Sequence, residues 1–238
     1  MRSSIFALAS VLTSVGIGAF ALGAGSASSL VWALGPLSET ERRMEALGLV
    51  DVARVDSTIV VELVYATADN FVGEVLYEDI SRAFLDPEAA EALVRAQRIL
   101  AERRPGLRLI VYDAARPMSV QARMHDMVAG TEKHIYVSDP AKGGGLHNYG
   151  LAVDVSIVDG DGVALDMGTA FDHLGFEANI DREGELVARG IISEAARRNR
   201  VLLREVMGAA GYMALRSEWW HFNFRSRAVA VEGYLVIE

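Results

Sequence analysis

The stretch that decides the fold is residues 143–155, GGGLHNYGLAVDV, in which a glycine-rich loop passes into an apolar run. Residues 151–158 predict a short, largely buried strand. Alternation along that strand places Asp154 on one face with Ala152 and Ser156. An ionised carboxylate on a buried strand costs several kcal/mol unless a charge partner or a metal compensates it. Because His147 lies seven residues upstream, we expect that compensation to be a metal.

Composition narrows the class of protein. The chain has 238 residues, of which 51% are hydrophobic and 23% charged, which suits one large globular domain. The net charge is −9 and no basic stripe is present, so we expect no nucleic-acid partner. The sequence contains no cysteine, which excludes disulfides, thiolate ligands and cysteine nucleophiles.

The N-terminus predicts a secretory signal over residues 1–27. Arg2 precedes an uncharged run at 5–22, and the small residues of 23–27 suit signal-peptidase cleavage. Residues 28–238 are then the folded domain, in the periplasm or secreted, with no stable membrane partner after cleavage. The alternative is an uncleaved membrane anchor with the domain still outside the cytoplasm.

The remaining patterns predict an α+β fold. Helices are expected to begin after the N-caps Ser38, Asp86, Ser119 and Ser193. Strands are expected at 107–112, 151–158 and 218–224, with two more within 49–64, and the chain ends in an apolar run at 229–237. Because no regular βαβ alternation is present, we predict a single domain with a mainly antiparallel central sheet flanked by helices.

A second informative stretch, 217–222 (SEWWHF), completes a candidate metal site. A catalytic zinc usually has three protein ligands, and His147, Asp154 and His221 supply two imidazoles and one carboxylate. Glu218 is then a candidate general base toward a water molecule that the metal activates. On a regular strand Glu218 and His221 would point to opposite faces, so Glu218 must lie in the turn before the strand or beside a bulge.

Five motifs follow one another along most of the mature chain: YATADNF at 65–71, YDAARP at 112–117, HNYGLAVD at 147–154, DMGTAFD at 166–172 and EWWH at 218–221. In this order they resemble the D-alanyl-D-alanine dipeptidases. These are zinc peptidases of the group that includes the vancomycin-resistance dipeptidases and D,D-carboxypeptidases. The resemblance implies hydrolysis of the D-Ala-D-Ala dipeptide in peptidoglycan-related metabolism.

The resemblance also implies roles for particular residues. It implies one zinc per chain, with ligands at His147, Asp154 and His221 and the catalytic glutamate at Glu218. The family's transition-state arginine corresponds to Arg116, and its pocket for the substrate amine to Asp172 and Tyr65. One departure is Gly145, where the family commonly has a serine that helps to hold the substrate.

Alternatives remain open from the sequence. The same metal site could serve a D,D- or L,D-carboxypeptidase that trims peptidoglycan stem peptides; a cleft closed at the amine end by Asp172 would instead admit only a dipeptide. A non-catalytic cell-wall-binding module with a structural zinc would need neither Glu218 nor Arg116. Arg116 could also be an ordinary ion-pairing residue of a loop, and Asp172 and Tyr65 could be structural.

Overall fold

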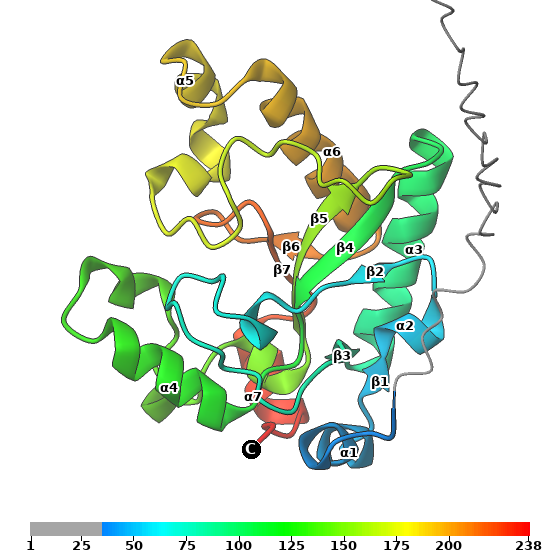
Figure 1. Ribbon diagram of the computed structural model, residues 1–238, viewed down its shortest axis with the longest axis vertical. Helices are drawn as coiled ribbons and strands as arrows, with labels where there is room; N and C mark the ends of the chain where they lie inside the picture. The colour runs from blue at the N-terminus through cyan, green and yellow to red at the C-terminus, as the bar shows by residue number, and fades with distance from the viewer. Residues whose placement is uncertain (1–34) are drawn as a thin grey trace, which may run out of the picture. The chain divides into compact units, whose positions relative to one another are not determined.

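The computed structural model describes residues 35–238, and the predicted signal segment lies outside the described residues. The described part is an α+β unit built on a five-stranded sheet with the strand order β2-β4-β5-β7-β6 (Figure 1). Only the β2–β4 pair is parallel, so the predicted mainly antiparallel sheet is confirmed. In chain order these strands are β2 (Val60–Val61), β4 (Arg108–Asp113), β5 (Ala152–Val158), β6 (Met213–Ala214) and β7 (His221–Asn223).

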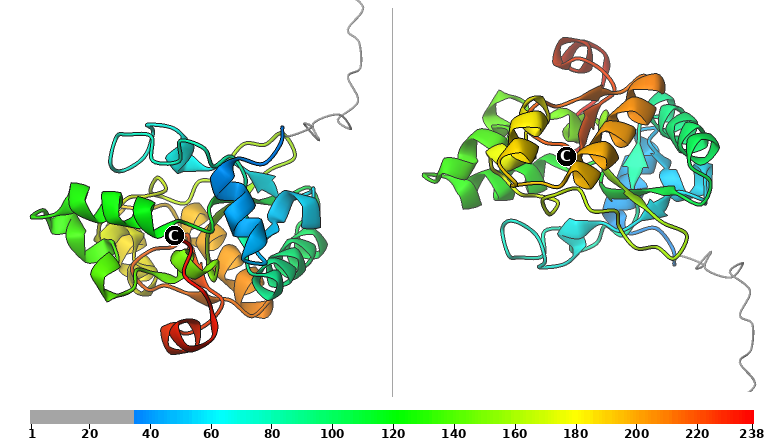
Figure 2. Two further views of the ribbon diagram at one scale, coloured as in Figure 1. Left: turned by 90° about the horizontal axis from the view of Figure 1, so that it is seen from below. Right: turned by 90° about the horizontal axis from the view of Figure 1, so that it is seen from above.

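Helices lie on both sides of the sheet. The two longest, α3 (Pro87–Arg103) and α6 (Glu194–Ala209), contact each other, and they contact β4 and β5 respectively. Helix α4 (Met118–Val128) lies at the opposite side of the domain from α3, with the central strands between them (Figure 2). The shorter helices are α1 (Glu39–Ala46), α2 (Val52–Val55), α5 (Glu183–Ala188) and α7 (Arg227–Gly233). Among residues 35–238, no helix is both long and apolar enough to cross a bilayer.

Local sequence signals account for most helix starts. Ser38 forms the predicted capping box with Glu41, and the side chains of Asp86 and Ser193 accept hydrogen bonds from the first turns of α3 and α6. The prediction for α4 was wrong by two residues, because its N-cap is Pro117 rather than Ser119. Pro117 fixes an extended backbone there, so the helix begins directly after it.

The segment 49–64 was predicted as two strands, and in the structure a short helix lies between them. It contains β1 (Val50–Asp51), which pairs with β3 (Phe84–Leu85), then the single helical turn α2, and then β2. The carboxylate of Asp51 accepts a hydrogen bond from the amide of Ala53 and so caps α2. This local cap overrides the β-branched composition of the segment.

Strand β5 is the buried centre of the sheet, as predicted. All seven of its residues are buried, and it pairs with β4 on one side and with β7 on the other. In this register Asp154 lies opposite His221 of β7 and opposite Asp113 of β4, where the β4 register shifts. The fold therefore brings Asp154, His221 and Asp113 together near the start of a strand whose other residues, apart from Ser156, are apolar.

Candidate active site

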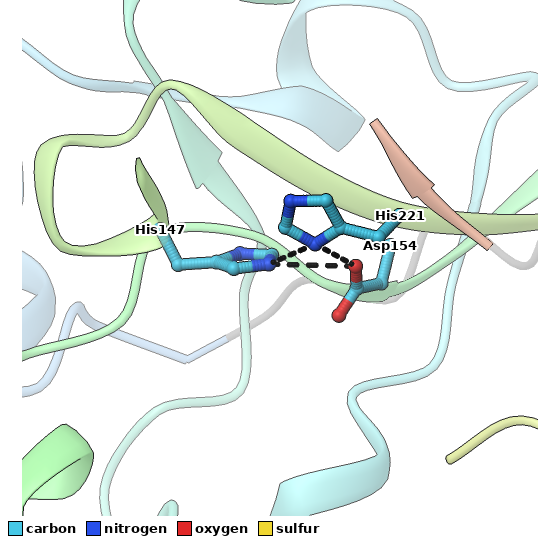
Figure 3. Close-up of side chains that lie close together, drawn as sticks. All are labelled: His147, Asp154 and His221. Atoms are coloured by element: carbon cyan, nitrogen blue, oxygen red, sulfur yellow. Dashed lines mark hydrogen bonds and ion pairs between the residues drawn. The ribbon is translucent and has the colours of Figure 1, made fainter. Parts of the chain in front are cut away.

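Three elements carry the predicted metal ligands. His147 lies on the 3-10 turn η4 (Leu146–Tyr149), Asp154 on β5 and His221 on β7. Gly150 ends η4 with a φ of 67°, a left-handed conformation that suits glycine, and so returns the chain into β5. Figure 3 shows the three side chains converging on one point.

The spacing of these side chains fits a tetrahedral zinc. Nδ1 of His221 lies 2.9 Å from Oδ1 of Asp154 and 3.1 Å from Nε2 of His147, and the remaining edge, from His147 Nε2 to Asp154 Oδ1, is 3.4 Å. Ligands about 2.0–2.1 Å from a tetrahedral zinc lie about 3.3 Å from one another. Two imidazoles and one carboxylate are also a donor set that zinc accepts, so the residues present fit the metal.

Each histidine is oriented by a hydrogen bond from its other ring nitrogen. Nδ1 of His147 donates to the carbonyl oxygen of Ala114 at 2.7 Å, and Nε2 of His221 donates to Oδ1 of Asn223 at 2.8 Å. These bonds fix the tautomers and leave His147 Nε2 and His221 Nδ1 to face the cluster. Neither Ala114 nor Asn223 was singled out by the sequence, because both partners depend on strand register.

The electrostatics of the cluster favour a cation at its centre. Burial would raise the pKa of Asp154, but the charges and hydrogen bonds of His147 and His221 hold it well below the usual value. Burial would lower the pKa of His221, yet the hydrogen bond to Asp154 outweighs burial and raises this pKa to about 9. The buried carboxylate of Asp154 thus stabilises positive charge between itself and the two histidines. A divalent metal can take that position.

Glu218 lies in the turn that precedes β7, one of the two placements that the sequence allowed. The amide of His221 donates to the carbonyl oxygen of Glu218 at 3.3 Å, which closes the turn. The Glu218 side chain reaches the cluster, with Oε2 3.9 Å from His221 Nδ1. Burial raises the pKa of this carboxyl to about 7, a value that suits a group that both takes up and releases a proton near neutrality.

Arg116 follows β4 and is held by a buried network. Its guanidinium donates to Asp113 and, through Nη1, to Oε1 of Gln121 at 2.9 Å, and Asp113 also accepts from the hydroxyl of Tyr77 at 2.5 Å. These bonds use three of the five guanidinium N–H groups and leave two (5 − 3). Asp113 stood within the arginine motif of the sequence, but nothing local indicated Gln121.

Asp172 and Tyr65 meet at one end of the site. The Tyr65 hydroxyl donates to Oδ1 of Asp172 at 3.0 Å, while the buried Oδ2 has no hydrogen-bond partner among residues 35–238. Burial, and then the negative charge of Asp154, raises the pKa of Asp172 well above its usual value. Asp172 has a φ of 60°, and it is the one non-glycine residue in the described part of the chain with a positive φ.

The predicted metal ligands and Glu218, Arg116, Asp172 and Tyr65 all border one cavity of about 250 Å³, so the structure brings every predicted site residue together. The cavity wall consists of Tyr65, Phe71, Arg116, Gln121, Met124, Tyr136, Val137, Ser138, Gly145, Leu146, His147, Asp154, Asp172, Leu174, Leu215, Glu218, Trp220, His221, Asn223 and Arg227. Gly145 is extended, with a φ of −106°, so its backbone does not require glycine. A Cβ at this position would lie 3.0 Å from Oγ of Ser138, which occupies the adjoining space.

The fold and site define a mixed α+β domain with a His/Asp/His metal centre beside a buried glutamate and arginine. The family model described as D-ala-D-ala dipeptidase matches residues 45–234, and the chain belongs to this family. It is 35% identical to the D-alanyl-D-alanine dipeptidase of Escherichia coli (strain K12), over 76% of this chain and 86% of that protein. It is 29% identical to the D-alanyl-D-alanine dipeptidase of Enterococcus faecium, over 68% of this chain and 83% of that one.

A likeness among solved structures is more distant. A mutant of the vancomycin resistance D,D-pentapeptidase VanY, in complex with Zn(II), aligns with a TM-score of 0.35 at 16% identity. The alignment covers 63% of this chain and 78% of that chain. The family assignment therefore stands on the sequence relatives and the family model, which agree with the resemblance inferred from the five motifs.

Proposed function

We propose that this protein is a zinc-dependent D,D-dipeptidase that hydrolyses D-alanyl-D-alanine. The observation that carries the proposal is that one cavity joins a metal cluster at His147, Asp154 and His221 to a buried carboxyl at Asp172. A metal at the cluster can activate the scissile amide, and the carboxyl of Asp172 can pair with a free substrate amine. A small peptide with a free amine offers both groups at a short separation.

In the proposed mechanism, zinc held by His147, Asp154 and His221 would polarise the scissile carbonyl and lower the pKa of water. Glu218 takes the proton from the attacking water and delivers it to the leaving amine, since its carboxyl is buried at the edge of the cluster. Arg116 donates its free N–H groups to the oxyanion that forms on the carbonyl oxygen. Tyr65 and Asp172 bind the substrate ammonium.

Arg116→Ala should lower kcat by on the order of 10²-fold with a smaller change in KM, because its contact is made mainly in the transition state. Steady-state kinetics on D-Ala-D-Ala measure both constants. Arg123→Ala is the matched control, since this half-exposed arginine of α4 pairs with Glu78 and the Val75 carbonyl and is not part of the cavity wall. A rise in KM alone for Arg116→Ala would make Arg116 a substrate anchor and not an oxyanion stabiliser.

Ser138 provides a second, smaller prediction. Ser138 borders the cavity, and its hydroxyl occupies the space that a serine side chain at position 145 would enter. We therefore propose that Ser138 supplies the hydroxyl that Gly145 lacks. Ser138→Ala should raise KM by up to about tenfold, the loss of one hydrogen bond of roughly 0.5–1.5 kcal/mol. Adding Gly145→Ser to Ser138→Ala should restore KM, whereas Gly145→Ser alone should not improve it. An unchanged KM in Ser138→Ala would remove this hydroxyl from substrate binding.

A carboxypeptidase acting on longer stem peptides is the second candidate, because another hollow adjoins the site. This hollow of about 750 Å³ shares Phe71, Tyr136 and Leu174 with the cavity wall. A product assay of the zinc-loaded protein on D-Ala-D-Ala, L-Ala-D-Ala and a pentapeptide distinguishes the two candidates. Release of D-alanine from D-Ala-D-Ala alone supports the dipeptidase, and release from the pentapeptide supports the carboxypeptidase.

We also propose that the domain acts outside the cytoplasm, in peptidoglycan-related metabolism. The support is the uncharged run at 5–22 followed by small residues. N-terminal sequencing of the protein recovered from the periplasm or medium tests this, and a mature chain that begins near residue 28 is the expected result. An intact Met1 on protein retained in the cytoplasm would contradict it.

A further inference from the structure

Arg200 of α6 is fully buried, yet it forms no ion pair with a carboxylate among residues 35–238. Nε donates to the carbonyl oxygen of Met167 at 2.6 Å, Nη1 to that of Glu177 at 3.0 Å, and Nη2 lies 3.4 Å from Oγ1 of Thr169. All three acceptors belong to the 166–177 loop. One side chain therefore ties both halves of this loop to the helix.

Burying a guanidinium in this way is expensive. Burial lowers the pKa of Arg200 to about 10, because the charged form loses its hydration. The two other buried arginines of the described residues have carboxylates that compensate their charge. Arg82 lies beside Asp51 and Glu41, and Arg116 pairs with Asp113. Arg200 has neutral acceptors instead, and an apolar side chain would fill such a position at lower cost. The guanidinium of Arg200, however, offers several N–H donors fixed in one plane, and no apolar side chain can make those hydrogen bonds.

Thr169 connects the same loop to the turn of Glu218. Its Oγ1 also accepts a hydrogen bond from Nε1 of Trp219 at 2.8 Å, and the Arg200 guanidinium lies 5.8 Å from the centre of the Trp219 ring. We name this set of three residues the Arg200 clamp: Arg200, Thr169 and Trp219. The clamp holds the loop and the segment beside Glu218 in one fixed relation.

Asp172 lies on this loop between the two carbonyl anchors, at positions 167 and 177. A non-glycine residue with positive φ is strained, and it persists only where its surroundings hold it. The hydrogen bond from Tyr65 fixes one carboxyl oxygen of Asp172, but it does not fix the backbone. Arg200 anchors the loop at Met167, before Asp172, and at Glu177, after it.

We propose that Arg200 is a positioning residue that sets Asp172 for the substrate amine. The inference rests on the proposed function, because it assigns Arg200 to the amine end of that site. Loss of the clamp should weaken binding of the amine more than it slows the chemistry. The histidines of the metal cluster keep their hydrogen bonds to Ala114 and Asn223, and the turn of Glu218 keeps the hydrogen bond from the amide of His221. The effect of Arg200 should therefore pass through Asp172.

A double-mutant cycle in the zinc-loaded full chain tests this directly. Arg200→Met should raise KM for D-Ala-D-Ala on the order of tenfold and leave kcat within about threefold. In an Asp172→Asn background the same change should raise KM less than about twofold, because the group that it positions is already lost. The matched control is Arg204→Met, since Arg204 lies one turn along α6 and pairs with Glu183.

Conservative variants keep the test decisive if Arg200→Met folds poorly. Arg200→Lys keeps the charge but cannot reach three acceptors, so its KM should stay raised, and Thr169→Val should raise KM in the same direction. Independent, multiplicative effects of Arg200→Met and Asp172→Asn would overturn the inference, as would full rescue of KM by lysine. If the wild-type protein does not cleave D-Ala-D-Ala, the proposed function fails, and the cycle is run on the dipeptide that it does cleave.

Discussion

Glu218→Gln should retain one zinc per chain and lose roughly 10²–10⁴-fold in kcat, the range for a positioned proton-transfer group. The amide keeps the shape and burial of the carboxyl but cannot accept the proton of the attacking water. The metal ligands are unchanged in this variant, since Oε2 of Glu218 lies 3.9 Å from Nδ1 of His221 and is not one of them. Zinc content by atomic spectroscopy and kcat on D-Ala-D-Ala check the two halves of the prediction separately.

The matched control for this variant is Glu62→Gln, an exposed carboxyl at the end of β2, which should leave both quantities unchanged. Glu218→Asp adds a graded test, because it keeps the carboxyl and withdraws it by one methylene. We expect its kcat to fall between those of the wild type and Glu218→Gln. A Glu218→Gln enzyme of near-normal rate would remove Glu218 from the proposed mechanism.

Local signals explain which parts of the fold were predictable. The caps at Ser38, Asp86 and Ser193 act within four residues of themselves, and the apolar run of β5 needs no knowledge of its partners. The predicted start of α4 was wrong because the helix begins directly after Pro117, without a side-chain cap, and the hydroxyl of Ser119 does not mark its start. The helical turn α2 was missed because a four-residue element leaves no periodicity to detect.

In the candidate site too, some residues could be predicted from the sequence and others could not. Its chemistry-bearing residues could be read from motifs, and a buried Asp154 required a positive partner in any fold. Their supports could not be predicted, because Ala114, Gln121 and Asn223 are brought to the site by strand register and by the packing of α4. Arg200 was missed for a further reason. It lies in a helix with several arginines, and sequence alone does not tell which of them turns inward.

His147→Ala should remove both the zinc and the activity. Two remaining ligands, Asp154 and His221, rarely hold zinc tightly, whereas three are the usual minimum for a catalytic site. His147 is also the ligand that comes from outside the sheet, so strand pairing of β5 with β7 survives its loss. The variant should therefore fold and still lack the metal. Zinc content after purification without added metal is the first measurement.

Thermal unfolding provides a readout that does not depend on turnover. Since zinc binds the folded chain at a preformed cluster, added zinc should raise the Tm of the wild type and leave the Tm of His147→Ala nearly unchanged. His134→Ala is the control, because this exposed imidazole hydrogen-bonds to the carbonyl oxygen of Thr131 and lies outside the cluster. If His147→Ala still carries one equivalent of zinc and its Tm responds as in the wild type, the metal is held elsewhere.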